Sequence, residues 1–567
     1  MRYFRSVLIS FVAPVLLSTL VSGQGQDTNA APVGSLAQAS TPVSLDQVVA
    51  KVIDREHFFM SQLRSLHPIV ETYIQNLKDN RESADLPASD QYFLGQLDMS
   101  HGPNDRAFAN KPDASFFHPI SKLTRLYQMK FLPRGFAQMA IVDEDLQRQN
   151  YDFAFVRREF LGEVRCLVLD VNPKRHPGNG QFKGRIWVED QDYNIVRFNG
   201  TYYPHARNSA YLHFDSWRLN LRPGLWLPAY IYSEESDLRF GFNHKLHLKA
   251  QTRMWGYDLQ KFNRNDELTE IVVDAPQSVR DQTTGAQDAT PIESQRLWER
   301  QAEENTIERL QKIGLVAPTG EVDKVLLTVV NNLLVTNNLE IQPEIRARVM
   351  LSSPLESFAI GHTIVISRGL LDVLPDEPSL AMVIAHELAH IALGHRVNTQ
   401  FSFSDRMLFP DSETFERLDF TRSPADEEAA DRKALELLSS SPYKDKLGNA
   451  GLFLKALQSR APELKSLIRP HMGNGLAEGK SLRMSALLNS APQLDMQRTD
   501  QIAALPLGAR IKLDPWSSRI ELVKTKPLAL TSSREKMPFE VTPFFPYLTR
   551  LPDTTPERAA AATPPSQ

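Results

Sequence analysis

The sequence predicts an α+β protein in which a mainly antiparallel β sheet or open barrel, led by a helix, precedes a mainly helical region with a small sheet. Three observations support this fold. Apolar residues recur at helical spacing from residue 45, the period changes to two between about 121 and 275, and helical patterns dominate 292–490. With 567 residues, the chain is long enough for several domains with cores of their own.

The composition is that of a globular protein. Apolar residues make up 42% of the chain and charged residues 23%, which excludes general disorder. The 64 Lys and Arg against 68 Asp and Glu leave a net charge of −4, so we expect no nucleic-acid partner. The single cysteine, Cys166, excludes an intramolecular disulfide, and its place in a β-type run predicts a buried small side chain.

The first residues predict an export signal. Arg2 and Arg5 precede an apolar run over 7–20, and small residues at 21–23 offer a cleavage site. An uncleaved membrane anchor is the alternative, but the run is shorter than the ~20 residues of a spanning helix and contains Pro14. We therefore expect a periplasmic or secreted protein, with peripheral membrane association left open.

Changes in composition and periodicity predict the order of segments along the chain. We expect a signal peptide at 1–23, a flexible leader at 24–44, a β-rich domain at 45–275, a linker at 276–291, a helical domain at 292–490, a β-rich extension at 491–552 and a disordered tail at 553–567.

Within the β-rich domain, two apolar series predict a helix over 45–79, divided at His67-Pro68. Residues 80–120 are rich in Pro, Asp, Asn and Gly, which predicts a loop. In the helical domain, one short β-type run is expected at 363–366.

The residues that carry chemistry begin with His386-Glu387-Leu388-Ala389-His390. This H-E-x-x-H pattern can occur by chance, but here it lies in a strongly helical, apolar stretch. Positions i and i+4 share a helix face, so both imidazoles can reach one cation. Glu387 lies beside that face and can take a proton from a zinc-bound water, whose pKa falls to about 7.

A catalytic zinc needs a third protein ligand. His395 does not have the spacing of the adamalysin-like pattern, which has glycine where Leu393 stands and histidine where Arg396 stands. Glu427 is the better candidate, in a helix-like segment 41 residues after His386, with Glu428 as the alternative. Asp431, one turn later, can hold the outer N–H of a ligating histidine. A solvated helix face is the other interpretation of this acidic cluster.

Four stretches make residues 322–432 similar to the HtpX-like zinc peptidases, the family that also contains the CAAX prenyl proteases. They are 322–325 with 331–333, 357–371, 386–390 and 427–431. The resemblance implies one zinc ion per chain on His386, His390 and Glu427, with Glu387 as general base. The family also binds extended substrate by adding it to an edge strand, which here implies the segment Gly361, His362, Thr363 and Ile364.

The resemblance further implies a histidine near the metal, which by position is His471, with Arg483 as an anion stabiliser. Two departures stand out. Met472 rather than proline follows His471, so a surface-loop histidine is the alternative, as is a fourth ligand. The segment Gly361-His362 also replaces a glycine pair. Residues 396–424, between the ligands, are a candidate lid.

Residues 45–275 resemble the LolA-type lipoprotein carriers, which are half-closed barrels with an apolar interior. The resemblance rests on 151–155 through 173–174 and on 182–188 through 200–202. It implies a pocket for an acyl chain or an apolar peptide. A simple core made of Phe153, Phe155, Trp187 and Phe198 explains the same composition equally well.

The combined expectation is an exported zinc endopeptidase that hydrolyses peptide bonds of envelope or misfolded proteins. One alternative is a lipid or lipoprotein carrier or chaperone with a latent peptidase domain. Another is a scaffold that zinc merely stabilises.

Overall fold

The structure is a computed structural model, and it describes residues 44–78, 86–98, 104–109, 136–144, 146–174, 181–203, 212–240, 244–257, 259, 291–397, 419–478, 481–492, 511–514, 519–522 and 546–552. The expected signal peptide, nearly all of the leader, the linker up to residue 290 and the tail lie outside these ranges. So does most of the expected lid.

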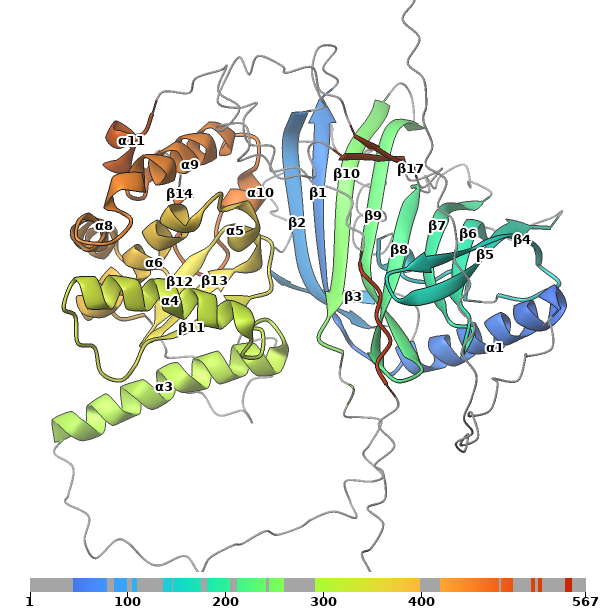
Figure 1. Cartoon of the computed structure of the whole chain (residues 1–567), viewed down its shortest axis with the longest axis horizontal. Coiled ribbons are helices and arrows are strands. Elements are labelled where there is room, and N and C mark those ends of the chain that lie inside the picture. The colour runs from blue at the N-terminus through green and yellow to red at the C-terminus, as the bar shows by residue number, and fades with distance from the viewer. Residues whose placement is uncertain are drawn as a thin grey trace, which may run out of the picture. The chain divides into compact units, whose positions relative to one another are not determined.

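A ten-stranded antiparallel sheet forms most of the amino-terminal half (Figure 1). Its order is β3-β2-β1-β10-β9-β8-β7-β6-β5-β4, so among the described strands β3 and β4 are the two edges and the sheet does not close. This confirms the expected half-barrel. The strands are β1 (Ile69–Lys78), β2 (Leu86–Asp98), β3 (Asn104–Ala109), β4 (Tyr151–Leu161), β5 (Val164–Pro173), β6 (Gln181–Glu189), β7 (Ile195–Tyr203), β8 (Phe214–Arg222), β9 (Leu225–Phe240) and β10 (His244–Trp255).

The leading helix α1 (Leu45–Leu63) packs against this sheet through its apolar face. Its buried Glu56 forms a two-pronged ion pair with Arg218 of β8, whose guanidinium lies over the Phe59 ring. Beneath the helix, the rings of Phe182, Phe198 and Phe214 stack edge-on or tilted within one core cluster. These aromatic side chains pack against one another in the described interior, as in an ordinary hydrophobic core. Phe155, in contrast, is exposed on edge strand β4.

Two expectations for this half are wrong. Residues 69–78 form strand β1 rather than the second part of a helix, because Pro68 ends the helical region and the following strand is buried on both faces. Apolar and polar residues do not alternate along a strand that is buried on both faces. The spacing of its apolar residues can therefore match that of a helix. The expected loop at 80–120 contains β2, which pairs with β1, and β3, which pairs with β2.

The second half is mainly helical, as expected, with a three-stranded sheet of order β11-β13-β12. The run expected at 363–366 is the middle strand, β12 is the edge strand that the family resemblance implies, and β11 has no counterpart among the expected strands. The bounds are α3 (Pro291–Ile313), α4 (Glu321–Thr336), β11 (Arg346–Met350), β12 (Ser357–Ile360), β13 (Thr363–Ser367), α5 (Arg368–Val373), α6 (Glu377–Ala392), α8 (Pro424–Ser439), η5 (Lys444–Lys446), α9 (Leu447–Arg460), α10 (Lys465–Ile468) and α11 (Leu487–Ser490), with short pairs β14 (Ala477–Glu478) and β15 (Ser481–Leu482), and β16 (Ile511–Asp514) and β17 (Arg519–Leu522).

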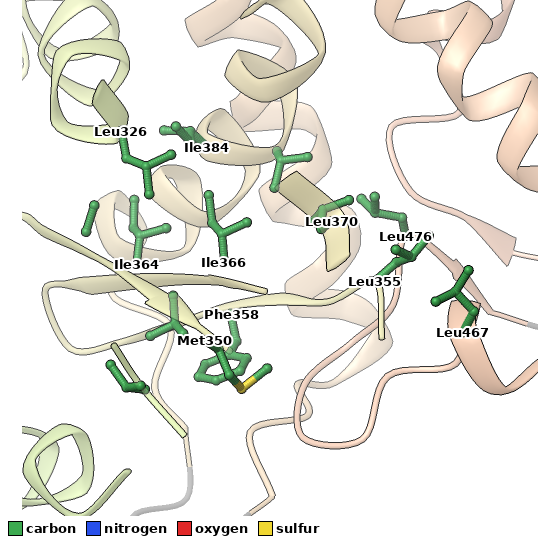
Figure 2. Close-up of a cluster of buried hydrophobic side chains, with 14 of the residues drawn as sticks. Leu326, Met350, Leu355, Phe358, Ile364, Ile366, Leu370, Ile384, Leu467 and Leu476 are labelled. Carbon is green, nitrogen blue, oxygen red and sulfur yellow. The ribbon is translucent and has the colours of Figure 1, made fainter. Parts of the chain in front are cut away.

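Buried aliphatic side chains hold the small sheet between the helices. Figure 2 shows Ile364 and Ile366 of β13 on the side that faces Leu326 of α4 and Ile384 of α6, with Phe358 on the opposite side. All of these side chains are at most 1% exposed. Because such cores resist rearrangement, β12 and α6 have fixed relative positions. None of the described helices is long and apolar enough to span a membrane.

Candidate metal centre

Helix α6 supplies two imidazoles and a carboxylate. Asp376 caps its first turn by accepting from the backbone N of Ser379 at 3.0 Å, and the following residues are strong apolar helix formers. The helix is buried almost all round, so His386 and His390 are only 5% and 1% exposed. Two imidazoles on one face of a buried helix require polar partners.

Helix α8 packs against α6 and brings in the third group. Ser423 caps its N-terminus by accepting from the backbone N of Asp426 at 3.2 Å. Glu427, at the next position, is 2% exposed, whereas Glu428 is exposed and lies 3.5 Å from the Arg432 guanidinium at the surface. The alternative that Glu428 is the inward residue therefore finds no support in the helix orientation.

Three ligand atoms converge. Nε2 of His386 lies 3.1 Å from Nε2 of His390 and 3.1 Å from Oε2 of Glu427, and Nε2 of His390 lies 3.5 Å from Oε1 of Glu427. A tetrahedral zinc ion with bonds of about 2.0–2.1 Å puts its ligand atoms about 3.3 Å apart. The separations and the buried donor set therefore fit a divalent metal such as zinc. Among the described residues, His386, His390 and Glu427 form a group that could hold a metal ion.

The charges of these groups depend on each other. Burial alone would lower the pKa of His386, but the Asp431 and Glu427 carboxylates raise it to about 9. Burial would raise the pKa of Glu427, but its contacts with His386 and His390 and the charge of Arg483 hold that pKa well below its usual range. Without a metal, Glu427 is thus an anion, ready to bind a cation.

Around the triad, further side chains fix its geometry. Oδ1 of Asp431 lies 2.9 Å from Nδ1 of His386, close enough for an ion pair although not aligned as a hydrogen bond. Arg483 forms an ion pair with Oε2 of Glu427, and Asn474 donates from Nδ2 to Oε1 of Glu427 at 2.5 Å. The carboxylate of Glu427 is therefore held on both of its oxygens.

Glu387 faces the small sheet. Its Oε1 accepts a hydrogen bond from the Ser357 hydroxyl at 2.7 Å, while its buried Oε2 has no hydrogen-bond partner among the described residues. A buried carboxylate oxygen without a partner is costly unless another group, such as water or substrate, binds it. Glu387 therefore has one oxygen fixed by β12 and one oxygen available.

Strand β12 is an edge of the small sheet and lies next to this carboxylate. Of the expected substrate-binding segment, Gly361 and His362 form the turn after β12, and Gly361 has a φ of +55°. Thr363 and Ile364 belong to β13, which pairs with β11 on one side and β12 on the other. In the described three-stranded sheet the edge strand is thus Ser357–Ile360, whose residues are buried, and substrate binding by residues 361–364 remains a prediction.

His471 lies against a residue of the large sheet. Its ring lies on Tyr92 of β2, with centroids 4.9 Å apart, and its Nε2 is buried without a hydrogen-bond partner. Burial lowers the pKa of His471 to about 4. The backbone N atoms of His471 and Met472 donate to Glu356 at 3.0 Å each. A catalytic role for His471 stays a prediction.

Sequence reasoning did not select three residues that the structure brings to the site. Ser357 holds Glu387, Asn474 holds Glu427, and the Arg422 guanidinium donates to the Ala359 carbonyl of β12 at 2.6 Å. Asn474 stands between two glycines, a weak signal of a tight loop. Nothing in the pattern around Ser357 or Arg422 separates them from ordinary polar residues.

Comparison with known proteins agrees with this geometry. Residues 320–410 match the model of peptidase family M48. The match includes the helix with His386, Glu387 and His390 but ends before Glu427, which the structure brings to the two imidazoles as a possible metal ligand. It confirms the resemblance expected from the sequence, and it supports a metallopeptidase-type domain in this region of the chain. No curated protein matches the chain.

Among solved structures, the chain is similar to a LolA superfamily protein from Nitrosomonas europaea, at 10% identity and a TM-score of 0.19, covering 37% of this chain and 92% of that chain. It is also similar to an outer membrane lipoprotein-sorting protein domain from Vibrio parahaemolyticus, at 12% identity and a TM-score of 0.19, covering 39% of this chain and 98% of that chain. Because these TM-scores are low, the half-barrel assignment rests on the open sheet itself.

Proposed function

We propose that this protein is a zinc-dependent endopeptidase. The supporting observation is the convergence of Nε2 of His386, Nε2 of His390 and the buried carboxylate of Glu427 within ligand distance of one another. The match to a metallopeptidase family over the same helix supports the reaction class. One zinc ion per chain would be held by these three residues.

A bound zinc would polarise the scissile carbonyl and lower the pKa of water. Glu387 would accept the proton of the attacking water through Oε2, while the Ser357 hydroxyl keeps Oε1 in place. The same carboxyl group would return the proton to the leaving amine. Arg483 and Asn474 would keep Glu427 oriented toward the metal, and Asp431 would orient His386.

The substrate would bind as an extended peptide along β12. An edge strand offers main-chain groups to any sequence, and alternate side chains then supply selectivity. This favours protein substrates cut within the chain. We further propose, from the family resemblance and the export signal, that the clients are envelope or misfolded proteins outside the cytoplasm.

A Glu387→Gln variant tests the enzymatic proposal, because glutamine keeps the size of the side chain but cannot take a proton. We expect wild-type protein loaded with zinc to cleave casein, and the variant to retain zinc but lose turnover at least 100-fold. Glu428→Gln, on the exposed side of α8, is the matched control and should cleave normally. Equal cleavage by wild type and Glu387→Gln would refute the proposal. Phospholipid recovered with an inactive wild-type protein would favour the carrier.

A further inference from the structure

Helix α6 ends in a way that turns His395 back onto a metal ligand. Gly394 has a φ of +71°, and its backbone N donates to the Ile391 carbonyl at 3.0 Å. The backbone N of His395 donates to the carbonyl of His390, also at 3.0 Å. These two bonds form a Schellman motif, whose left-handed residue is usually glycine. The motif places residue 395 beside residue 390.

The side chains of these two residues meet as a result. Nδ1 of His390 lies 2.9 Å from Nδ1 of His395, and the ring centroids are 5.1 Å apart. Nε2 of His395 points toward Asp426, at 3.6 Å from Oδ1. Since Nε2 of His390 belongs to the triad, its Nδ1 is the outer nitrogen, which in metal-bound histidines donates to an acceptor that fixes the ring.

We propose that His395 is the positioning residue for the metal ligand His390. The assignment of protons follows from the geometry. A metal on Nε2 of His390 leaves the proton on Nδ1, so Nδ1 donates to Nδ1 of His395. His395 then carries its own proton on Nε2, the atom that faces Asp426. The inference rests on the proposed metal site, but it adds a residue that contacts neither metal nor substrate.

The two ligand histidines thus have different outer partners. His386 has the Asp431 carboxylate at 2.9 Å, whereas His390 has a second imidazole. The triad already contains the Glu427 carboxylate, and the carboxylates of Glu387 and Asp431 lie close to it, so an imidazole rather than a carboxylate at position 395 orients His390 without placing another carboxylate in contact with it.

The test is the zinc affinity of the full-length protein, measured by competition with a chelator. Asparagine places its amide oxygen where histidine has Nδ1, whereas glutamine places it nearer the position of Nε2. We expect His395→Ala and His395→Gln to bind zinc about 10- to 100-fold more weakly, and His395→Asn to bind within about three-fold of wild type. His57→Ala, which removes an exposed imidazole on α1, is the control.

The outcomes separate this inference from the proposed function. One zinc bound tightly by wild type, with unchanged affinity in His395→Ala, would overturn the positioning role and leave the metal centre intact. Equal weakening in all three His395 variants, asparagine included, would also overturn it. Circular dichroism of the metal-free variants must match wild type, so that a lost fold is not taken for lost orientation. A wild-type protein that does not bind zinc would refute the proposed function.

Discussion

The Ser357 hydroxyl donates to Oε1 of Glu387 at 2.7 Å and so joins the edge strand of the small sheet to the carboxylate next to the metal ligands. The other oxygen of Glu387 is buried and has no hydrogen-bond partner in the part of the chain that the structure describes. A carboxylate held through one oxygen presents the second in a fixed direction, which is the arrangement that a general base requires.

Replacing Ser357 with alanine should therefore lower kcat about 10- to 100-fold, because a hydrogen bond to a charged group is worth about 1.5–3 kcal/mol. Zinc content should not change, since Ser357 contacts no ligand of the triad. Steady-state kinetics with a fluorescent peptide checks kcat, and metal analysis checks the zinc content. Ser352→Ala removes a buried hydroxyl that has no hydrogen-bond partner and should retain wild-type kcat. An unchanged kcat in Ser357→Ala would show that Glu387 needs no such support.

Arg422 occupies a position that a substrate strand would need. Its guanidinium donates to the carbonyl of Ala359 on edge strand β12 at 2.6 Å, and its Nε is buried without a partner. If an extended peptide must take over this carbonyl, Arg422→Met should lower KM about three-fold with little change in kcat. A rise in KM would show instead that Arg422 binds the substrate. Arg432→Met, on the exposed side of α8, is the control.

The burial of His471 predicts a pH effect on stability. Its pKa of about 4 in the folded protein lies below the usual value of about 6.5 in an unfolded chain, so the native state binds fewer protons between these values. The stability that neutral His471 contributes is complete above about pH 6.5 and is lost as the pH falls toward 4. Phenylalanine keeps the ring on Tyr92 but does not titrate.

Urea unfolding of wild type and His471→Phe between pH 7 and 4 should therefore show wild type losing stability relative to the variant, by up to about 1.4 kcal/mol per pH unit. Parallel pH curves would contradict the burial of this ring. The same variant tests a catalytic role. We expect His471→Phe to keep its turnover at pH 7. A 100-fold loss of kcat in a folded variant would instead show that His471 takes part in the reaction.

Much of the metal centre could be predicted from sequence because its geometry is local. His386 and His390 share a helix face by their spacing alone, and Glu427 belongs to a second helix whose acidic residues are few enough to test one by one. His395 was set aside because it lacks the spacing of a direct ligand. The glycine before it is the sequence signal that reverses the chain toward His390.

The remaining contacts depend on tertiary structure. Ser357, Arg422 and Asn474 lie in segments that meet only after β12 and α8 have both packed against α6, so no periodicity points to them. The error at 69–78 has a similar origin, since a strand buried on both faces gives no alternation to read. The sequence pattern of one helix or strand predicts which of its residues share a face, but it does not predict which elements pack together.

The most direct test of the account is the metal content of purified wild type beside Glu427→Ala and Glu428→Ala. Glu427 is buried against both ligand imidazoles, while its neighbour Glu428 is exposed at the surface. We predict about one zinc per chain in wild type and Glu428→Ala and almost none in Glu427→Ala. A full complement of zinc in Glu427→Ala would contradict the proposed centre.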